Sequence, residues 1–375
     1  MRRFAAFAAA LLVAASGFAQ KGARDVPPLA PKVGLATRVF HPEAHRNWRG
    51  SERHELHVII WYPAVDTATE VPQVIGTPDS PLFQAGSAAP NAEMVPALHK
   101  MPLVVLSHGT GGSAAQMAWL GTALAREGFI AAAVDHPGNN ATEPYTAEGF
   151  TLWWERATDL SEVLDDLLKD PEFGPRIEEK SIGAAGFSLG GYTVMELAGA
   201  ETDVGVLYDQ CHPHPNSSAC HVPEMDQITP PIRNAEDLLE RVRKTSGESL
   251  ARSGESYRDP RVKAVFAVAP AIAAVLTPDS LHAIRLPVEI VVGDADPIAP
   301  AKENADYIRA NVRGARENVL PGGVAPYTFL DTCTAAGKQS LPVFCGDAAT
   351  VNRDEVHKLA AGAAVQFFEK ALKFR

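Results

Sequence analysis

The chain has 375 residues, of which 46% are hydrophobic and 21% are charged, a composition typical of ordinary globular proteins. Its formal net charge is −11, with 34 Lys and Arg against 45 Asp and Glu, and no long run of like charge occurs. Nucleic acid is therefore not an expected partner, because proteins that bind it concentrate positive charge.

The first twenty residues, MRRFAAFAAALLVAASGFAQ, have the pattern of a secretory signal peptide. Two arginines precede an apolar stretch, and Gly17 and Ala19 fit the rule of small residues before a cleavage site. A membrane anchor is the alternative, but the apolar run is shorter than the roughly 20 residues that a span needs. We expect a signal peptide over residues 1–19, and a mature single domain over residues 20–375 that lies in the periplasm or outside the cell, with no transmembrane segment.

The next segments predict the start of a sheet. Residues 36–40, ATRVF, and 56–63, LHVIIWYP, are apolar and β-branched enough to form two strands, which we expect to pair as an antiparallel hairpin at the sheet edge. Residues 66–100 are rich in Pro, Ala, Gly and Thr and are typical of a long surface loop.

From residue 102 onward, apolar strands alternate with helices. The predicted strands cover 102–109, 129–138, 181–187, 262–270, 286–296 and 316–322, and the predicted helices cover 114–128, 158–170, 190–200 and 352–372. Unbroken apolar strands in this alternation indicate an α/β fold, with a mostly parallel central sheet and helices on both faces. Residues 203–260 break the pattern, so we expect an inserted cap region over the carboxyl edge of the sheet.

A serine stands at the junction of one predicted strand and helix. The segment Gly186-Phe187-Ser188-Leu189-Gly190 has the G-x-S-x-G pattern of a nucleophile elbow, which lifts a reactive hydroxyl above the sheet. The alternative is a glycine-rich turn with an inert serine. SHGTGG follows the first parallel strand, where this architecture supplies an oxyanion-hole donor. We therefore predict the backbone N–H groups of Thr110 and Leu189 as the two donors, with His108 in a structural turn role.

These motifs make the chain resemble the α/β-hydrolases, and more closely the bacterial secreted relatives of platelet-activating factor acetylhydrolase and dienelactone hydrolase. The matching stretches are LHVIIWYPA, PLVVLSHGTGGS, GFIAAAVDHPGN, GAAGFSLGGYT, VVGDADPIAP, YTFLDTC and NRDEVH. The resemblance implies the α/β-hydrolase fold and a secreted serine esterase for small-molecule esters. Such an enzyme uses no metal or organic cofactor and acts in lipid degradation on short-acyl or phospholipid-like substrates. A dienelactone or polyester hydrolase is a second alternative, and the oligomeric state stays open.

The catalytic acid belongs after a late strand, because the chain order in this architecture is Ser, then Asp or Glu, then His. VVGDADPIAP offers Asp294 and Asp296. The family pattern, an acid shortly before a proline-containing helix start, matches Asp296. Either carboxylate would otherwise serve as a turn or cap residue.

The histidine is missing from its expected place. In the relatives the loop after the last strand carries a histidine before an aromatic residue, whereas this chain has Pro326 before Tyr327. His357 is the only histidine after Asp296. Three explanations compete: His357 is recruited as the base, the protein is catalytically impaired or binding-only, or the sequence is a variant of an active parent.

His136 follows a predicted parallel strand, so it opens at the edge where ligands bind. It is either a pocket residue or a hydrogen-bonded turn histidine.

Four cysteines allow three pairings, and in an oxidising compartment we expect the two local bridges, Cys211–Cys220 and Cys333–Cys345. Free buried thiols are the alternative. The spacing in CHPHPNSSACH does not fit a zinc site, so no metal is expected.

Overall fold

The computed structural model describes residues 31–43, 46–96, 99–214, 220–232 and 235–373. The expected signal peptide lies outside these residues. Within the described part of the chain, no helix combines the length and the apolar character needed to cross a membrane.

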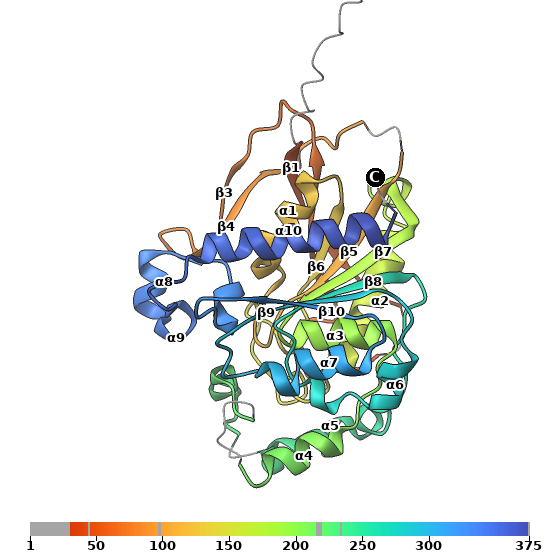
Figure 1. The fold of residues 1–375 in the computed structure, drawn as a ribbon, viewed down its shortest axis with the longest axis vertical. Helices are drawn as coiled ribbons and strands as arrows, with labels where there is room; N and C mark the ends of the chain where they lie inside the picture. The colour runs from red at the N-terminus through yellow and green to blue at the C-terminus, as the bar shows by residue number, and fades with distance from the viewer. Residues whose placement is uncertain (1–30, 44–45, 97–98, 215–219, 233–234, 374–375) are drawn as a thin grey trace, which may run out of the picture. The chain divides into compact units, whose positions relative to one another are not determined.

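One large sheet forms the centre of the molecule (Figure 1), with the strand order β10-β9-β8-β7-β5-β6-β2-β1-β4-β11 and β3 paired to β4. The strands are β1 (Lys32–Phe40), β2 (Leu56–Ala64), β3 (Val71–Thr77), β4 (Ser80–Pro90), β5 (Met101–Ser107), β6 (Ile130–Val134), β7 (Ile177–Phe187), β8 (Val262–Val268), β9 (Val288–Gly293), β10 (Arg316–Leu320) and β11 (Thr332–Cys333). The run from β10 to β6 is parallel, and β2 joins it in antiparallel orientation. The predicted α/β class is therefore confirmed.

Helices cover both faces of this sheet. The described residues form the helices α1 (Ala118–Arg126), α2 (Glu155–Leu167), α3 (Leu189–Ala198), α4 (Val204–Cys211), α5 (Ala235–Ala251), α6 (Pro278–Ala283), α7 (Ala305–Asn311), α8 (Ala335–Ser340), α9 (Pro342–Cys345) and α10 (Arg353–Ala371), of which α4 and α5 belong to the expected insertion. Two core clusters result, one shared with α2, α3 and α7 and the other with α1 and α10. Leu103 and Val105 of β5 belong to the first cluster and Val104 and Leu106 to the second. This division explains the unbroken apolar strands, because both faces of each central strand are buried.

The N-terminal hairpin is confirmed, since β1 and β2 pair in antiparallel register. Its expected position at the sheet edge is wrong, because β4 pairs with β1 and extends the sheet further. The predicted loop over 66–100 is also wrong, since it contains β3 and β4. These strands are rich in small residues and proline, and β3 is largely exposed. Backbone pairing along this edge therefore forms without the apolar alternation by which strands are recognised.

The parallel strands bring several loops to one edge of the sheet. The turns after β5, β7 and β9 all follow carboxyl ends, which is the edge where ligands bind in α/β proteins. Residues of α4, α5 and the short 3-10 helix η3 (Pro223–Gln227), all in the expected insertion, line a cavity together with these turns.

Candidate active site

Ser188 occupies a strained turn between β7 and α3. Its backbone has φ 55° and ψ −117°, a conformation rare for any residue other than glycine. The neighbouring glycines are required: a β-carbon on Gly186 would lie 2.1 Å from Gly190 O, and one on Gly190 would lie 2.0 Å from Ser107 O. The turn is held by a 2.8 Å hydrogen bond from Ser188 N to Val268 O. The G-x-S-x-G segment thus adopts the elbow conformation that the sequence predicts.

The hydroxyl of Ser188 is exposed to the cavity and makes no hydrogen bond within the described structure. The residue is half-buried, and it lines the large cavity above the sheet edge. None of the hydrogen bonds among the described residues involves Ser188 Oγ, so the oxygen has neither a structural role nor a base in contact with it. Ser188 also precedes the first turn of α3, where unpaired N–H groups and the helix dipole favour negative charge.

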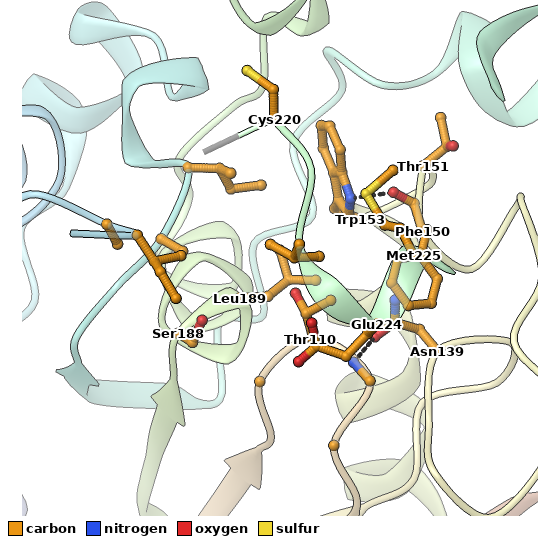
Figure 2. Close-up of a pocket in the computed structure, with 18 of the residues that line it drawn as sticks. Thr110, Asn139, Phe150, Thr151, Trp153, Ser188, Leu189, Cys220, Glu224 and Met225 are labelled. Atoms are coloured by element: carbon orange, nitrogen blue, oxygen red, sulfur yellow. Dashed lines mark hydrogen bonds between the residues drawn. The ribbon is translucent and has the colours of Figure 1, made fainter. Parts of the chain in front are cut away.

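Two backbone donors stand next to this hydroxyl. In the described structure, neither Thr110 N–H nor Leu189 N–H has a hydrogen-bond acceptor, and both residues line the same cavity as Ser188 (Figure 2). The loop that carries Thr110 lies close, since a β-carbon on Gly109 would lie 3.3 Å from the Ser188 β-carbon. In serine hydrolases, unpaired donors beside the reactive hydroxyl stabilise a developing oxyanion.

A buried polar network supports the loop that carries Thr110. Asn139 Oδ1 accepts a 2.8 Å hydrogen bond from Gly111 N, and Arg156 donates both to Asn139 Oδ1 and to His108 O. His108 is fully buried, and its Nδ1–H donates to Gly109 O at 2.7 Å. His108 therefore has the structural turn role expected from the sequence.

His136 does not line the cavity. It is fully buried, its Nε2 accepts from Ser107 Oγ at 2.8 Å, and its Nδ1–H donates to Asp159 Oδ2 at 2.7 Å. Burial and the neighbouring Arg156 lower the pKa of His136 to about 3, so the imidazole is neutral. This chain of three side chains has the connectivity of a catalytic triad. It is sealed from substrate, however, so of the two sequence interpretations the hydrogen-bonded turn histidine fits.

The two candidate acids have different surroundings. Asp294 is exposed and accepts hydrogen bonds from the backbone N–H groups of Gly322, Gly323 and Val324, which lower its pKa. Asp296 Oδ1 accepts from the N–H groups of residues 298 and 299, at 2.8 and 2.7 Å. Its Oδ2 is buried and has no hydrogen-bond partner among the described residues, and burial raises the pKa of this carboxyl. Asp296 therefore has one oxygen free to orient a base, whereas Asp294 is committed to a turn.

Pro326 begins the short 3-10 helix η6 (Pro326–Phe329) and lines the cavity with Ser188. The structure does not bring His357 to this point. His357 projects from α10, its Nε2 faces Thr328 O at 3.1 Å, and its ring stacks on Trp119 with centroids 4.9 Å apart. Burial lowers the pKa of His357 to about 4. These contacts favour a packing role for His357.

The cavity itself is large and mainly apolar. Its volume is ≈ 1350 Å³, above the range of about 300–1,000 Å³ that is typical of small-molecule sites. Phe344, Trp153 and Phe150 supply aromatic wall. Figure 2 shows Phe150 and Trp153 together with Glu224 of η3, which brings a buried carboxyl into the cavity. The sequence analysis did not identify Glu224, because nothing in the polar segment PEMDQ indicates that its first acid is buried.

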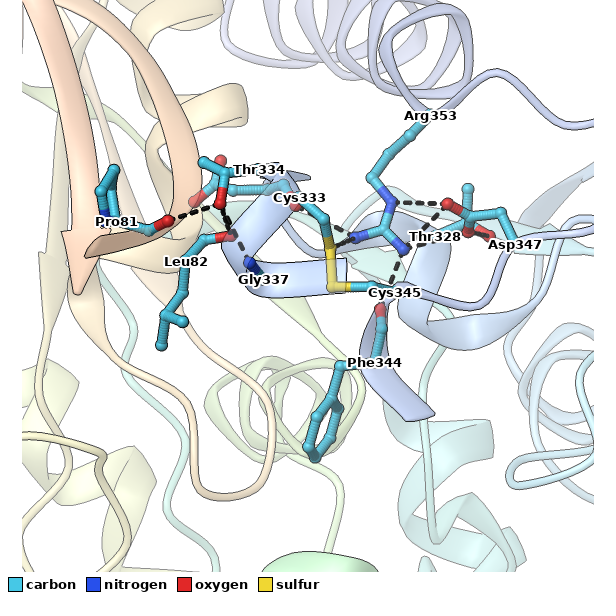
Figure 3. The surroundings of a disulfide bond; sticks show 11 residues. Pro81, Leu82, Thr328, Cys333, Thr334, Gly337, Phe344, Cys345, Asp347 and Arg353 are labelled. Carbon is cyan, nitrogen blue, oxygen red and sulfur yellow. Dashed lines mark hydrogen bonds and ion pairs between the residues drawn. A yellow bond between two sulfur atoms is a disulfide. The ribbon is translucent and has the colours of Figure 1, made fainter. Parts of the chain in front are cut away.

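Both expected cysteine pairs are at bonding distance, with S–S separations of 1.96 Å for Cys211–Cys220 and 2.06 Å for Cys333–Cys345. The first pair ends α4 in the expected insertion. The second joins β11 to α9, and Arg353 packs against it while donating to Phe344 O at 2.9 Å (Figure 3). Both bridges thus lie in segments that line the cavity.

Comparisons with known proteins agree with this geometry. The sequence model of the Alpha/beta hydrolase family matches residues 104–328, a segment that includes Thr110, Ser188 and Asp296. Among solved structures, a ferulic acid esterase from Streptomyces cinnamoneus is similar in fold, with a TM-score of 0.60 and 20% sequence identity. That match covers 94% of this chain and 93% of the esterase chain. No curated protein was found to match the sequence.

Proposed function

Because this chain belongs to the alpha/beta hydrolase family, we propose that it hydrolyses carboxylic esters through an acyl-enzyme on Ser188. The observation that carries the proposal is the pairing of an unbonded, cavity-facing hydroxyl with two unpaired backbone donors, Thr110 N–H and Leu189 N–H. A protein that only needed a tight turn would have no reason to hold Ser188 at φ 55°, because such strain costs about 1–3 kcal/mol.

In the proposed reaction, Ser188 Oγ attacks the ester carbonyl and its proton passes to a base. The carbonyl oxygen becomes an oxyanion that Thr110 N–H and Leu189 N–H stabilise, each donor contributing about 3 kcal/mol. The alcohol leaves with that proton. Water then attacks the acyl-enzyme carbonyl, the same donors stabilise the second oxyanion, and the carboxylic acid leaves as Ser188 Oγ regains a proton. Asp296 is the proposed acid, since its free Oδ2 can accept a hydrogen bond from an imidazole and stabilise its charge.

The general base is the group that this site lacks among the described residues. Proline cannot exchange a proton, and among the described residues no histidine contacts Ser188 Oγ. Loss of the base from a serine triad costs on the order of 10⁶ in kcat in subtilisin. We therefore propose that the natural chain is a slow esterase and that Pro326 limits its rate.

Hydrolysis of p-nitrophenyl acetate by the natural chain and three variants tests this proposal. Pro326→His is expected to raise kcat by roughly 10³-fold, because an imidazole there would complete the triad with Asp296. His357→Ala is expected to leave kcat within a few-fold, because His357 packs against Trp119. Ser188→Ala should abolish activity in both backgrounds. If His357→Ala removes activity in a folded protein, His357 is the recruited base.

A binding-only protein on the same scaffold is the second candidate, and Pro326 is the observation that favours it. Such a protein would keep the cavity for a ligand and would have no activated serine. It predicts that Pro326→His leaves the rate at the level of Ser188→Ala.

If turnover is found, a panel of short-acyl esters, phospholipids, lactones and polyesters would define the substrate class.

We further propose that the chain is secreted. Two disulfides support this, because such bridges persist in the periplasm and outside the cell.

The apolar wall of the cavity supports an ester with a bulky apolar group, and the phospholipid-like class remains the proposed substrate. The structural neighbour described above is named as an esterase, in line with the proposed reaction class.

A further inference from the structure

We propose that Glu224 is a third oxyanion donor, which in its neutral acid form donates a hydrogen bond to the substrate carbonyl oxygen. This inference rests on the proposed function of Ser188, and it assigns a catalytic role to the segment Pro223–Gln227, which lies outside the parallel-sheet scaffold. The proton stays on Glu224 throughout, so the role adds no step to acyl transfer.

The position of Glu224 is the first argument. Only 7% of the residue is exposed, and it lines the same cavity as Ser188. Its side chain packs directly over the loop that carries Thr110, since a β-carbon on Gly111 would lie 2.8 Å from Glu224 Cγ. Figure 2 shows Glu224 beside Thr110, on the side of the cavity that the loop forms. The carboxyl therefore lies next to a predicted oxyanion donor.

The second argument is that one oxygen of the carboxyl lacks a structural partner. Glu224 Oε2 is buried, and no hydrogen bond reaches it within the described structure. The hydroxyl of Tyr145, which also lies close to Gly111, donates to Gly111 O at 2.7 Å rather than to this oxygen. A buried polar atom without a partner costs about 1–3 kcal/mol, so a ligand that bonds to this oxygen would remove a penalty already present in the free protein.

The third argument is the charge state. Tyr145 and Tyr327 are titratable groups that interact with the carboxyl. Burial raises the pKa of both hydroxyls, and a negative charge on Glu224 would raise it further. Among the described residues, no cationic side chain pairs with Glu224. Burial therefore raises the pKa of Glu224 to about 7. Below that pH the group is a neutral acid that donates, whereas above it a carboxylate would oppose the oxyanion.

The pH dependence of Ser188 labelling by a fluorophosphonate tests the role, because phosphonylation develops charge on the same oxygen and needs no turnover. We expect the labelling rate of the natural chain, divided by that of Glu224→Gln, to fall about tenfold or more between pH 6 and pH 9. The amide of Glu224→Gln donates at every pH, so the labelling rate of this variant should not decline above pH 7. Glu224→Ala should label roughly tenfold more slowly than the natural chain at pH 6.

Asp226→Asn is the matched control. Asp226 belongs to the same short helix and is exposed, where it pairs with His221, so this variant removes one charge without changing the cavity wall. Its labelling rate should follow the pH dependence of the natural chain. Thermal unfolding of each variant identifies losses that come from misfolding.

Two results would overturn the role of Glu224 and leave the serine mechanism intact. One is an identical pH profile for the natural chain and Glu224→Gln. The other is loss of labelling at all pH values in a folded Glu224→Gln, which would make the carboxylate a base. The natural chain alone adds a test, because its rate should decrease above pH 7. Absence of labelling in both the natural chain and Pro326→His would instead reject the serine mechanism, and the donor role with it.

Discussion

At the residue scale, the buried carboxyl groups of this protein differ in whether an arginine faces them. Asp159 accepts a 2.5 Å hydrogen bond from Arg49 Nη2 and contacts Arg46, and these cations hold its pKa well below the usual range. Glu196 of α3 is equally buried, but its partners are the hydroxyl groups of Tyr192 and Thr202. Burial raises the pKa of Glu196 to about 8.

This difference makes the stability of the fold depend on pH. An unfolded glutamate has a pKa near 4.3, so between about pH 4.3 and pH 8 the folded state holds a proton that the unfolded state has lost. The Glu196 contribution is therefore complete below pH 4.3 and is lost as the pH rises toward 8. Glu196→Gln should remove this loss and raise the free energy of unfolding at pH 8, relative to the natural chain, by on the order of 3 kcal/mol.

Urea unfolding at pH 5 and pH 8 measures the effect. The gap between the two proteins should be small at pH 5 and large at pH 8. An equal gap at both pH values would mean that Glu196 is not protonated in the folded state.

At the scale of elements, α9 and the residue before it form a wall of the cavity that lies outside the central parallel strands. Leu341 and Phe344 line the cavity, and the Phe344 ring packs edge-on against Tyr327 with centroids 4.8 Å apart. The Cys333–Cys345 bridge and Arg353, which donates to Asp331 O and pairs with Asp347, fix this segment to β11 and α10.

Cys333→Ser with Cys345→Ser is expected to lower the free energy of unfolding by about 3 kcal/mol, because the bridge closes a short loop. The looser wall should raise KM for a bulky naphthyl ester more than KM for p-nitrophenyl acetate. Urea denaturation and the two KM values check both effects. A proportionate rise in both KM values would show that the segment does not contact the bulky group.

At the scale of the whole molecule, the architecture follows from local patterns that can be recognised in the sequence. Val104 and Leu106 alternate with Leu103 and Val105 between the two cores, and the unbroken apolar run predicts a parallel strand. The glycines around Ser188 predict the elbow because only glycine tolerates such close backbone contacts. The fold, the elbow and the cysteine pairing can therefore be predicted from the sequence.

Other features depend on tertiary contacts. Strands β3 and β4 are not predicted from the sequence because β3 is largely exposed and the side chains that β4 buries, apart from Phe83, are alanines. The choice between packing and catalysis for His357 required the positions of Trp119 and Thr328. Glu224 is indistinguishable in sequence from Asp226, yet one is buried over Gly111 and the other is exposed. Such differences arise from segments far apart in the chain.

The most direct measurement of the central claim is site mapping of a fluorophosphonate adduct by mass spectrometry. The account predicts a single adduct on the peptide that contains Ser188, formed faster in Pro326→His and absent in Ser188→Ala. Labelling that maps to another residue, or that persists in Ser188→Ala, would contradict acyl transfer at this serine.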